Sequence, residues 1–427
     1  MIDLVVRDVR LAGEEAAVDL HVDDGSFVAV VPHVESEPEA RTVVEAGGGF
    51  VSAPFVEPHV HLDAVLTAGE PRWNESGTLW EGIACWSERK PMLTREDVVT
   101  RVEEVLRWYA ANGTLHVRSH VDVTDRSFVA LDALLEVRER VRDVTTLQLV
   151  AFPQEGIVSF PDGEELLEEA ARRGVDVIGA IPHYEDTRED GVRSVHVAVD
   201  LAERYGVRVD AHCDEIDDEQ SRFIEVLATL AHRTGLADRV TASHTTAMGS
   251  YNPAYSYKLH RIIARSGINM VTNPLVNLHL QGRFDGYPKR RGLSQVKELL
   301  AAGVNVAFGH DDIMDPWYPL GTANALQVAH AGAHATQLMS RLEIEECFSM
   351  VTSRGAAVLG LGEEYGVQVG RPASFVVLPA EDGFDAIRRQ VRVSHVVSHG
   401  HVLATTPPVT TTLTWPGQEP RAVDFRR

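Results

Sequence analysis

Short apolar runs alternate with amphipathic stretches through the central part of the chain, from residue 50 to about residue 315. Each run is rich in valine, alanine and other small or branched residues, which is typical of strands that are buried on both faces. The runs that we interpret as strands are FVEPHVHLD (55–63), TLHVRSHVDV (114–123), TLQLVAFP (146–153), DVIGAIPH (176–183), RVDAHCDE (208–215), VTASHTT (240–246), NMVTNP (269–274) and NVAFGHDD (305–312).

The stretches between these runs have the spacing of helices. In residues 95–112, apolar side chains recur three and four positions apart, Thr94 is suited to cap the start, and Gly113 is suited to end the helix. Asp162 and Ser294 precede two further predicted helices. The central region therefore alternates regularly between strand and helix.

Eight strand–helix units predict an α/β protein with a (β/α)8 TIM barrel. A doubly wound sheet is the alternative, and it predicts a glycine-rich phosphate loop after the first strand. No GxGxxG or GxxxxGK[ST] motif follows any of the runs, which disfavours that alternative.

The two ends of the chain have a different pattern. Residues 1–50 and 373–405 contain short alternating strands with turn residues and no helical periodicity. We expect both ends to pair in one small β-sandwich-like domain. The predicted boundaries are a β-rich N-terminal part at 1–53, the barrel at 54–370 and a β-rich C-terminal part at 371–427.

Composition and charge narrow the class of protein. The hydrophobic content of 44% and the charged content of 24% are ordinary for a soluble globular protein. No apolar run is long enough to cross a bilayer and the N-terminus lacks a signal layout, so we expect a cytoplasmic protein without a membrane partner. The net charge of −23 argues against a nucleic-acid partner. The 3 cysteines include no CxxC pair, which disfavours disulfide frameworks and thiolate zinc sites.

Metal-ligand residue types gather at the ends of the predicted strands. His59 and His61 are two apart on the first run, so both imidazoles point to the same face. Active sites of such barrels lie at the carboxyl ends of the strands, so residues there converge. The converging residues come from runs one, five, six and eight: His59, His61, His212, Glu215, His244, Asp311 and Asp312.

Other histidines fit this pattern less well. His120 and His183 end runs two and four, and we interpret them as structural or supporting groups. His330 and His334 share a helical face outside the strand ends, and we interpret them as structural.

Three imidazoles and one carboxylate suit Zn²⁺ or Fe²⁺. Two-metal barrels of this kind commonly use a bridging lysine from a middle strand. Between His61 and His212 the only lysine is Lys90, in a loop, so we expect a single metal ion. Glu215 is placed to move a proton, and spacing leaves open whether His244 binds the metal or the hydroxide.

These residues resemble the amidohydrolase superfamily and, within it, the barrel-type bacterial cytosine deaminases. The stretches that carry the resemblance, from about residue 50 onward, are WNESGTLWEGI, AFPQEGI, GAIPHYEDTRE, HCDEIDDEQSRF, ASHTTAM, NPLVNLHLQGRFDGYPKRRG and FGHDDIMDPWYPLGTAN. The resemblance implies that His59, His61, His212 and Asp311 bind one divalent ion, Fe²⁺ or Zn²⁺. It also implies a homo-oligomer with a small nucleobase as substrate.

The resemblance further implies roles for residues around the ring. Glu215 delivers a proton to ring N3, and His244 polarises the metal-bound hydroxide. Gln154 pairs with the O2 and N1–H edge of the pyrimidine. Asp312 lies near the exocyclic amine and C5, and Trp317 helps to close the pocket.

The predicted reaction is hydrolytic deamination of cytosine to uracil and ammonia, by attack of metal-bound hydroxide at C4. Asp311 serves both as a ligand and as acceptor of the proton from water. The alternatives are a deaminase of a related ring such as isoguanine or 5-methylcytosine, an amidohydrolase-type enzyme that opens an amide ring, and a barrel that binds without catalysis. The missing mid-strand lysine disfavours ring opening.

Overall fold

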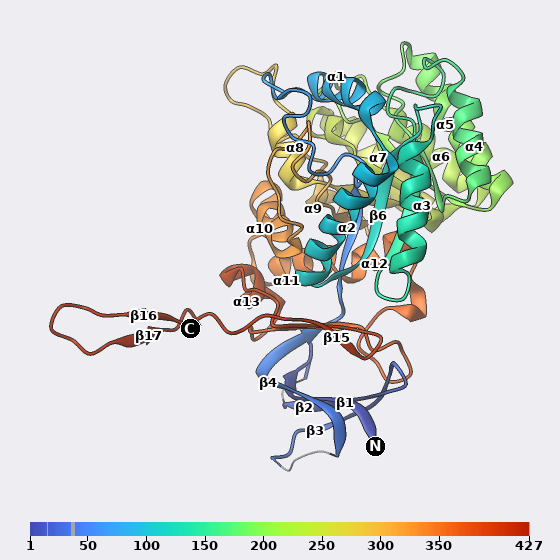
Figure 1. Ribbon diagram of the computed structural model, residues 1–427. Helices are drawn as coiled ribbons and strands as arrows, with labels where there is room; N and C mark the ends of the chain where they lie inside the picture. The colour runs from blue at the N-terminus through green and yellow to red at the C-terminus, as the bar shows by residue number, and fades with distance from the viewer. Residues whose placement is uncertain (15, 36–38, 427) are drawn as a thin grey trace. The chain divides into compact units, whose positions relative to one another are not determined.

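The computed structural model describes residues 1–14, 16–35 and 39–426 (Figure 1). Contacts between Cα atoms divide the chain into two compact units. One unit contains Phe55–Tyr109 and Thr114–Gly362. The other contains Met1–Pro54, Ala110–Gly113 and the C-terminal segment from Glu363.

The first unit is a parallel eight-stranded barrel with helices around it, as the sequence predicts. Each predicted run forms one strand, and sequential strands are hydrogen-bonded neighbours. The strands are β5 (Phe55–Val60), β6 (Thr114–Asp122), β7 (Thr146–Phe152), β8 (Val177–Ala180), β9 (Arg208–Cys213), β10 (Val240–His244), β11 (Asn269–Thr272) and β12 (Asn305–Phe308).

The first and last strands of the barrel meet at a seam, where Val60 forms an isolated parallel bridge with Asp311. The backbone N–H of Asp311 donates to the carbonyl of His59 at 2.8 Å, and the N–H of His61 donates to the carbonyl of Asp311 at 2.9 Å. The seam therefore fixes His59, in β5, and His61, directly after it, beside the aspartate that follows β12.

The helices of this unit start and end close to the predicted positions. Thr94 Oγ1 accepts the N–H of Asp97 at 3.2 Å before α2, and Gly113 takes a left-handed φ of 87° beyond it. The helices are α1 (Leu79–Arg89), α2 (Arg95–Ala111), α3 (Val129–Val141), α4 (Gly163–Arg173), α5 (Arg188–Tyr205), α6 (Phe223–Thr234), α7 (Pro253–Ser266), α8 (Pro274–Leu280), α9 (Val296–Ala301), α10 (Ala325–Thr336), α11 (Arg341–Met350) and α12 (Ser353–Leu359).

Two predicted helix starts differ in detail. Asp162 precedes α4, but its side chain accepts no hydrogen bond from the helix and pairs instead with Arg126. α9 begins at Val296, with Gln295 rather than Ser294 at the capping position. Within the described part of the chain, no helix has the length and apolar composition needed to cross a membrane.

The second unit joins both ends of the chain in one seven-stranded sheet. Its centre is the antiparallel pair of β4 and β13, in which Val51 lies opposite Val377. The rings of Phe27 and Phe375 pack with centroids 5.6 Å apart in its core. Its elements are β1 (Ile2–Arg10), β2 (Val18–Asp23), β3 (Ser26–Pro32), β4 (Ala40–Ser52), β13 (Phe375–Leu378), α13 (Gly383–Arg389), β14 (His395–Ser398), β15 (His401–Thr405) and the hairpin β16 (Thr411–Leu413) and β17 (Arg421–Val423).

Candidate active site

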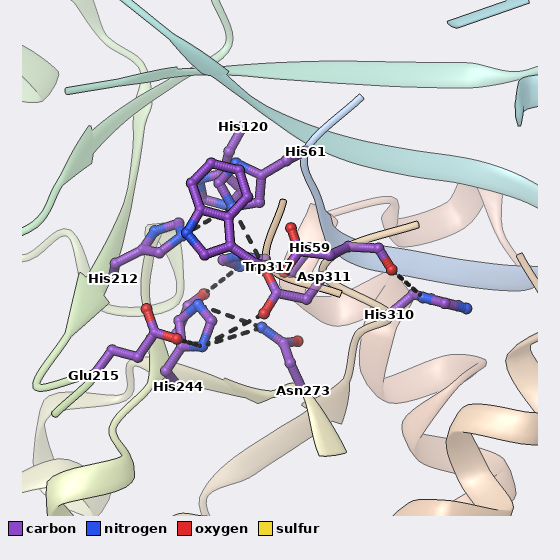
Figure 2. A network of polar contacts seen from close by, with 12 residues as sticks. His59, His61, His120, His212, Glu215, His244, Asn273, His310, Asp311 and Trp317 are labelled. Atoms are coloured by element: carbon purple, nitrogen blue, oxygen red, sulfur yellow. Dashed lines mark hydrogen bonds and ion pairs between the residues drawn. The ribbon is translucent and has the colours of Figure 1, made fainter. Parts of the chain in front are cut away.

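The carboxyl ends of the barrel strands bring the predicted polar residues together, as Figure 2 shows. His59 lies in β5, His212 in β9, and His244 is the last residue of β10. His61 follows β5 directly, and Asp311 lies just beyond β12. All five side chains are buried.

The side chains of this cluster face a common point. His61 Nε2 lies 3.1 Å from His212 Nε2, and Asp311 Oδ1 lies 3.3 Å from His59 Nε2 and 3.6 Å from His61 Nε2. Donor atoms of His59, His212, His244 and Asp311 all lie within 4.8 Å of one another. The structure therefore brings His244 into the cluster along with the four residues predicted as ligands.

The imidazoles of the cluster present lone pairs rather than charges. Burial and neighbouring histidines hold the pKa of His59 well below its usual range, and burial lowers the pKa of His61 to about 3. Two neutral imidazole nitrogens at 3.1 Å, with a carboxylate oxygen beside them, leave unused lone pairs that a cation would satisfy. This donor set fits a divalent ion with mixed nitrogen and oxygen ligands.

His59 is oriented from behind by buried polar groups. Its Nδ1 lies 2.9 Å from Ser243 Oγ, and that hydroxyl donates to Asp210 Oδ1 at 2.7 Å. The Ser243 oxygen is thus free to accept the Nδ1–H of His59. Nε2 of His59 has no hydrogen-bond partner among the described residues, which leaves it to face the cluster as a ligand.

Glu215 and His244 form the second part of the site. Glu215 Oε1 lies 3.2 Å from His244 Nδ1, and the amide nitrogen of Asn277 lies 3.1 Å from the same ring atom. Burial, assisted by the charge of Asp217, raises the pKa of Glu215 to about 8. This shift favours the protonated form of the carboxyl group, which is the form that can donate a proton.

The backbone is strained where these strands end. His244, Thr245 and Asp311 have left-handed φ angles of 64°, 50° and 71°. Residues with a Cβ rarely adopt this conformation, and such strain gathers at functional sites. His244 and Asp311 belong to the cluster and Thr245 directly follows His244, which supports a functional role for these strand ends.

A small cavity opens onto the cluster. Gln154, Asp312 and Trp317, predicted from sequence to surround the substrate, all line it, together with Leu79 and Leu280, which were not predicted. The remaining lining residues are Glu215 and four members of the cluster, His61, His212, His244 and Asp311.

Two carboxyl groups organise the loop that follows β12. Asp312 and Asp315 are hydrogen-bonded to each other, and burial raises the pKa of both, that of Asp315 to about 6. Asp315 Oδ1 accepts the backbone N–H groups of Trp317 at 2.9 Å and Tyr318 at 3.0 Å. The pair thereby links the cavity wall at Asp312 to the backbone that carries Trp317.

The other histidines and the loop lysine lie outside the cavity lining. The ring of His120 stacks on that of His59 with centroids 3.9 Å apart, and His183 Nδ1 accepts the N–H of Glu215 at 3.4 Å. Lys90 is held by Asp122 at 3.0 Å and by Glu155. The rings of His330 and His334 contact each other on α10, with centroids 4.5 Å apart.

Several residues of the site were not predicted from sequence: Ser243, Asn273, Asn277 and Asp315. A usable signal for the two asparagines was the segment NPLVN, which follows the seventh strand directly and so reaches the same end of the barrel. Ser243 immediately precedes His244, but its side chain binds the back of His59 rather than facing the cavity.

Comparison with known proteins agrees with this geometry. A 5-methylcytosine deaminase from Klebsiella pneumoniae, solved with 5-fluorocytosine, is 48% identical with a TM-score of 0.93, over 97% of this chain and 100% of that chain. N-isopropylammelide isopropyl amidohydrolase of Pseudomonas sp. (strain ADP) is 28% identical over 94% of this chain and 97% of its own length. Pterin deaminase of Rhizobium rhizogenes (strain K84 / ATCC BAA-868) is 27% identical, with shares of 90% and 87%. The sequence model of the amidohydrolase family matches residues 42–404, which include the whole barrel, so the chain belongs to the amidohydrolase family.

Proposed function

We propose that this chain deaminates the cytosine ring by hydrolysis, converting cytosine to uracil and ammonia. The observation that carries the proposal is a single cavity in which Gln154, Glu215 and the histidine–aspartate cluster meet. The likeness to a 5-methylcytosine deaminase with a bound cytosine analogue, at 48% identity, supports the same substrate class.

The cluster would hold one divalent ion, Fe²⁺ or Zn²⁺, through His59, His61, His212 and Asp311. When bound, such an ion lowers the pKa of a coordinated water and so supplies hydroxide at neutral pH. The imidazoles of the cluster are neutral, and burial and the charge of Glu215 raise the pKa of Asp311. A bound cation would compensate the negative charge of the Asp311 carboxylate, so these residues suit a site that holds an ion.

Recognition of the ring falls to Gln154. Its amide offers one donor and one acceptor, which complement the N1–H and O2 edge of cytosine. The apolar side chains of Leu79, Leu280 and Trp317 enclose the rest of the cavity and exclude water from a planar ring.

Proton transfer falls to the acidic residues. The attacking water adds to C4 and gives its proton to Asp311, while the protonated carboxyl of Glu215 donates to ring N3. The proton on Asp311 then moves to the exocyclic amine. The C4–N bond breaks as the C4 hydroxyl returns its proton to Glu215, so ammonia leaves and the C4 carbonyl of uracil forms. His244, 3.2 Å from Glu215 and held by Asn277, orients the water during the attack.

5-Methylcytosine is the second candidate substrate, and the named relative at 48% identity favours it. The wall that would meet a C5 substituent contains Asp312 and the segment from Asp315 to Trp317. Both candidates use the same amide edge and the same C4 chemistry, so they differ only at this wall.

A substrate panel tests the proposal. Ammonia release and kcat/KM are measured for cytosine, 5-methylcytosine and isoguanine on one metal-loaded preparation, with Glu215→Gln as the inactive control. We expect turnover of cytosine. A much higher kcat/KM for 5-methylcytosine would select the second candidate, whereas activity on isoguanine alone, or a ring-opened product, would contradict the proposal.

A further inference from the structure

We infer that Gly82 in helix α1 sets the position of the Trp317 indole and thereby the size of the ring that the cavity accepts. The inference rests on the proposed function, because the size of the ring is judged against cytosine and its 5-methyl derivative. It assigns a specificity role to a helix that contributes no polar group to the cavity lining.

Gly82 lies in the interior of α1, where glycine is a poor helix former. Its backbone is ordinarily helical and its N–H donates to the carbonyl of Thr78 at 3.1 Å, so no unusual φ requires a glycine. The reason is steric. A Cβ atom at this position would lie 2.3 Å from Cδ1, 2.6 Å from Nε1 and 2.9 Å from Cγ of Trp317.

The indole of Trp317 lies close to both Gly82 of α1 and the site. Its ring centroid lies 6.1 Å from that of His61, and the residue lines the cavity. Its Nε1 is buried and has no hydrogen-bond partner among the described residues. The position of the indole is therefore set by packing rather than by a polar contact of its own.

The helix that supports the indole is itself fixed. Trp86, one turn after Gly82, packs against Trp317 with centroids 6.3 Å apart. Its Nε1 donates to Asp122 Oδ2 at 2.9 Å, and the same carboxylate is paired with Lys90 at 3.0 Å. Since α1 is anchored through Trp86, a side chain added at Gly82 would displace the indole rather than the helix.

Displacement away from α1 moves the indole toward the cavity. The space lost is about that of one methyl group, which is the difference between the two candidate rings. A change of one methylene in an apolar pocket alters discrimination by roughly 10- to 200-fold. The structure therefore assigns to Gly82 the room needed for a 5-substituted ring.

The test compares kcat/KM for 5-methylcytosine with kcat/KM for cytosine. In Gly82→Ala the ratio should fall by about tenfold, and in Trp317→Phe, which removes part of the indole, the ratio should rise. Gly332→Ala is the matched control, since a Cβ there would lie 2.4 Å from the ring of Phe308, which does not line the cavity. Its ratio should equal that of the wild type, even if its thermal stability falls.

A ratio within twofold of the wild type in folded Gly82→Ala would overturn the inference, since a merely structural defect lowers both kcat/KM values together. If Gly82→Ala does not fold, Trp317→Phe decides, and an unchanged ratio there overturns the inference. A wild type inactive on both pyrimidines would contradict the proposed function instead. Crystal structures of wild type and Gly82→Ala would then decide whether the indole moves into the cavity.

Discussion

His59 acts as a ligand only if its ring is held in one tautomer. Ser243 accepts from Nδ1, Asp210 accepts from Ser243, and Arg118 Nη1 lies 2.9 Å from Asp210. Arg118 and Asp210 are both fully buried, so their charges compensate each other beneath the cluster. A hydrogen-bond partner on the ring nitrogen that faces away from the metal raises the basicity of a histidine ligand and fixes its orientation.

Ser243→Ala should therefore weaken metal binding by about 10- to 100-fold, because Nδ1–H of His59 loses its acceptor. Affinity is measured by competition with a chelating dye. Ser194→Ala is the control, since Ser194 is also buried but donates to the carbonyl of Gly191 in α5. Equal affinity in the Ser243 variant and the wild type would contradict the assigned tautomer.

Glu215→Gln should lower kcat by about 10²- to 10⁴-fold, since the amide has no acidic proton for ring N3. Metal content, measured by elemental analysis, should stay near that of the wild type. His61→Ala is the contrasting variant and should lose metal. Metal loss from Glu215→Gln would identify Glu215 as a ligand rather than a proton carrier.

At the level of single residues, the sequence predicted the site residues whose types are rare inside buried strands. It missed the site residues whose types are common throughout a protein. Histidines and carboxylates at the ends of apolar runs stand out, and Glu215 and Asp312 from that set line the cavity. Gln154 also lines it, but it was expected only from the family resemblance. Asn277 and Ser243 are not of these residue types, and for Asn277 the only signal was its place in NPLVN, directly after the seventh strand. Their roles exist only because α8 and β10 bring them against rings from other parts of the chain.

The element on which the site depends most is the seam between β5 and β12. Glu57 lies beneath it, buried, with Oε1 accepting the N–H groups of His59 and His310, each at 3.0 Å. Tyr109 O–H donates to its other oxygen at 3.1 Å. Burial raises the pKa of Glu57 to about 8, which favours its neutral form.

Glu57→Ala should lower the free energy of unfolding by about 2–4 kcal/mol, because two buried N–H groups lose their acceptor. Glu57→Gln should cost much less, since a neutral amide keeps the accepting oxygen. Urea unfolding of the metal-free protein measures both, with the exposed Glu75→Ala as control. Equal losses for Gln and Ala at position 57 would mean that the hydrogen bonds do not stabilise the seam.

Element order was fully predictable, because buried parallel strands appear as isolated apolar runs and each became a strand. The ends of the elements were less predictable than their order. The first run continues to Asp63, yet β5 ends at Val60, since pairing with Asp311 replaces the regular ladder there. Asp162 is a residue type that often caps helices, but its side chain forms an ion pair with Arg126, a contact that the local sequence does not reveal.

For the whole molecule, the predicted ion is also a source of stability. Removing it should lower the thermal midpoint, because a ligand present at 100 times its Kd adds about 2.7 kcal/mol to the folded state. Chelation followed by addition of Zn²⁺ or Fe²⁺ should lower and then restore the midpoint, measured by calorimetry. His61→Ala should show neither change. If chelation leaves the thermal midpoint of the wild type unchanged, the ion does not contribute to stability.

The seam also determines the stage of chain synthesis at which the site residues can come together. His59 and His61 leave the ribosome about 250 residues before Asp311, and the two ends of the barrel meet at the seam that contains the bridge between Val60 and Asp311. A nascent chain therefore offers histidines without their carboxylate until the last strand has been made. An ion that needs all of these ligands would therefore be held only after the complete barrel has been synthesised.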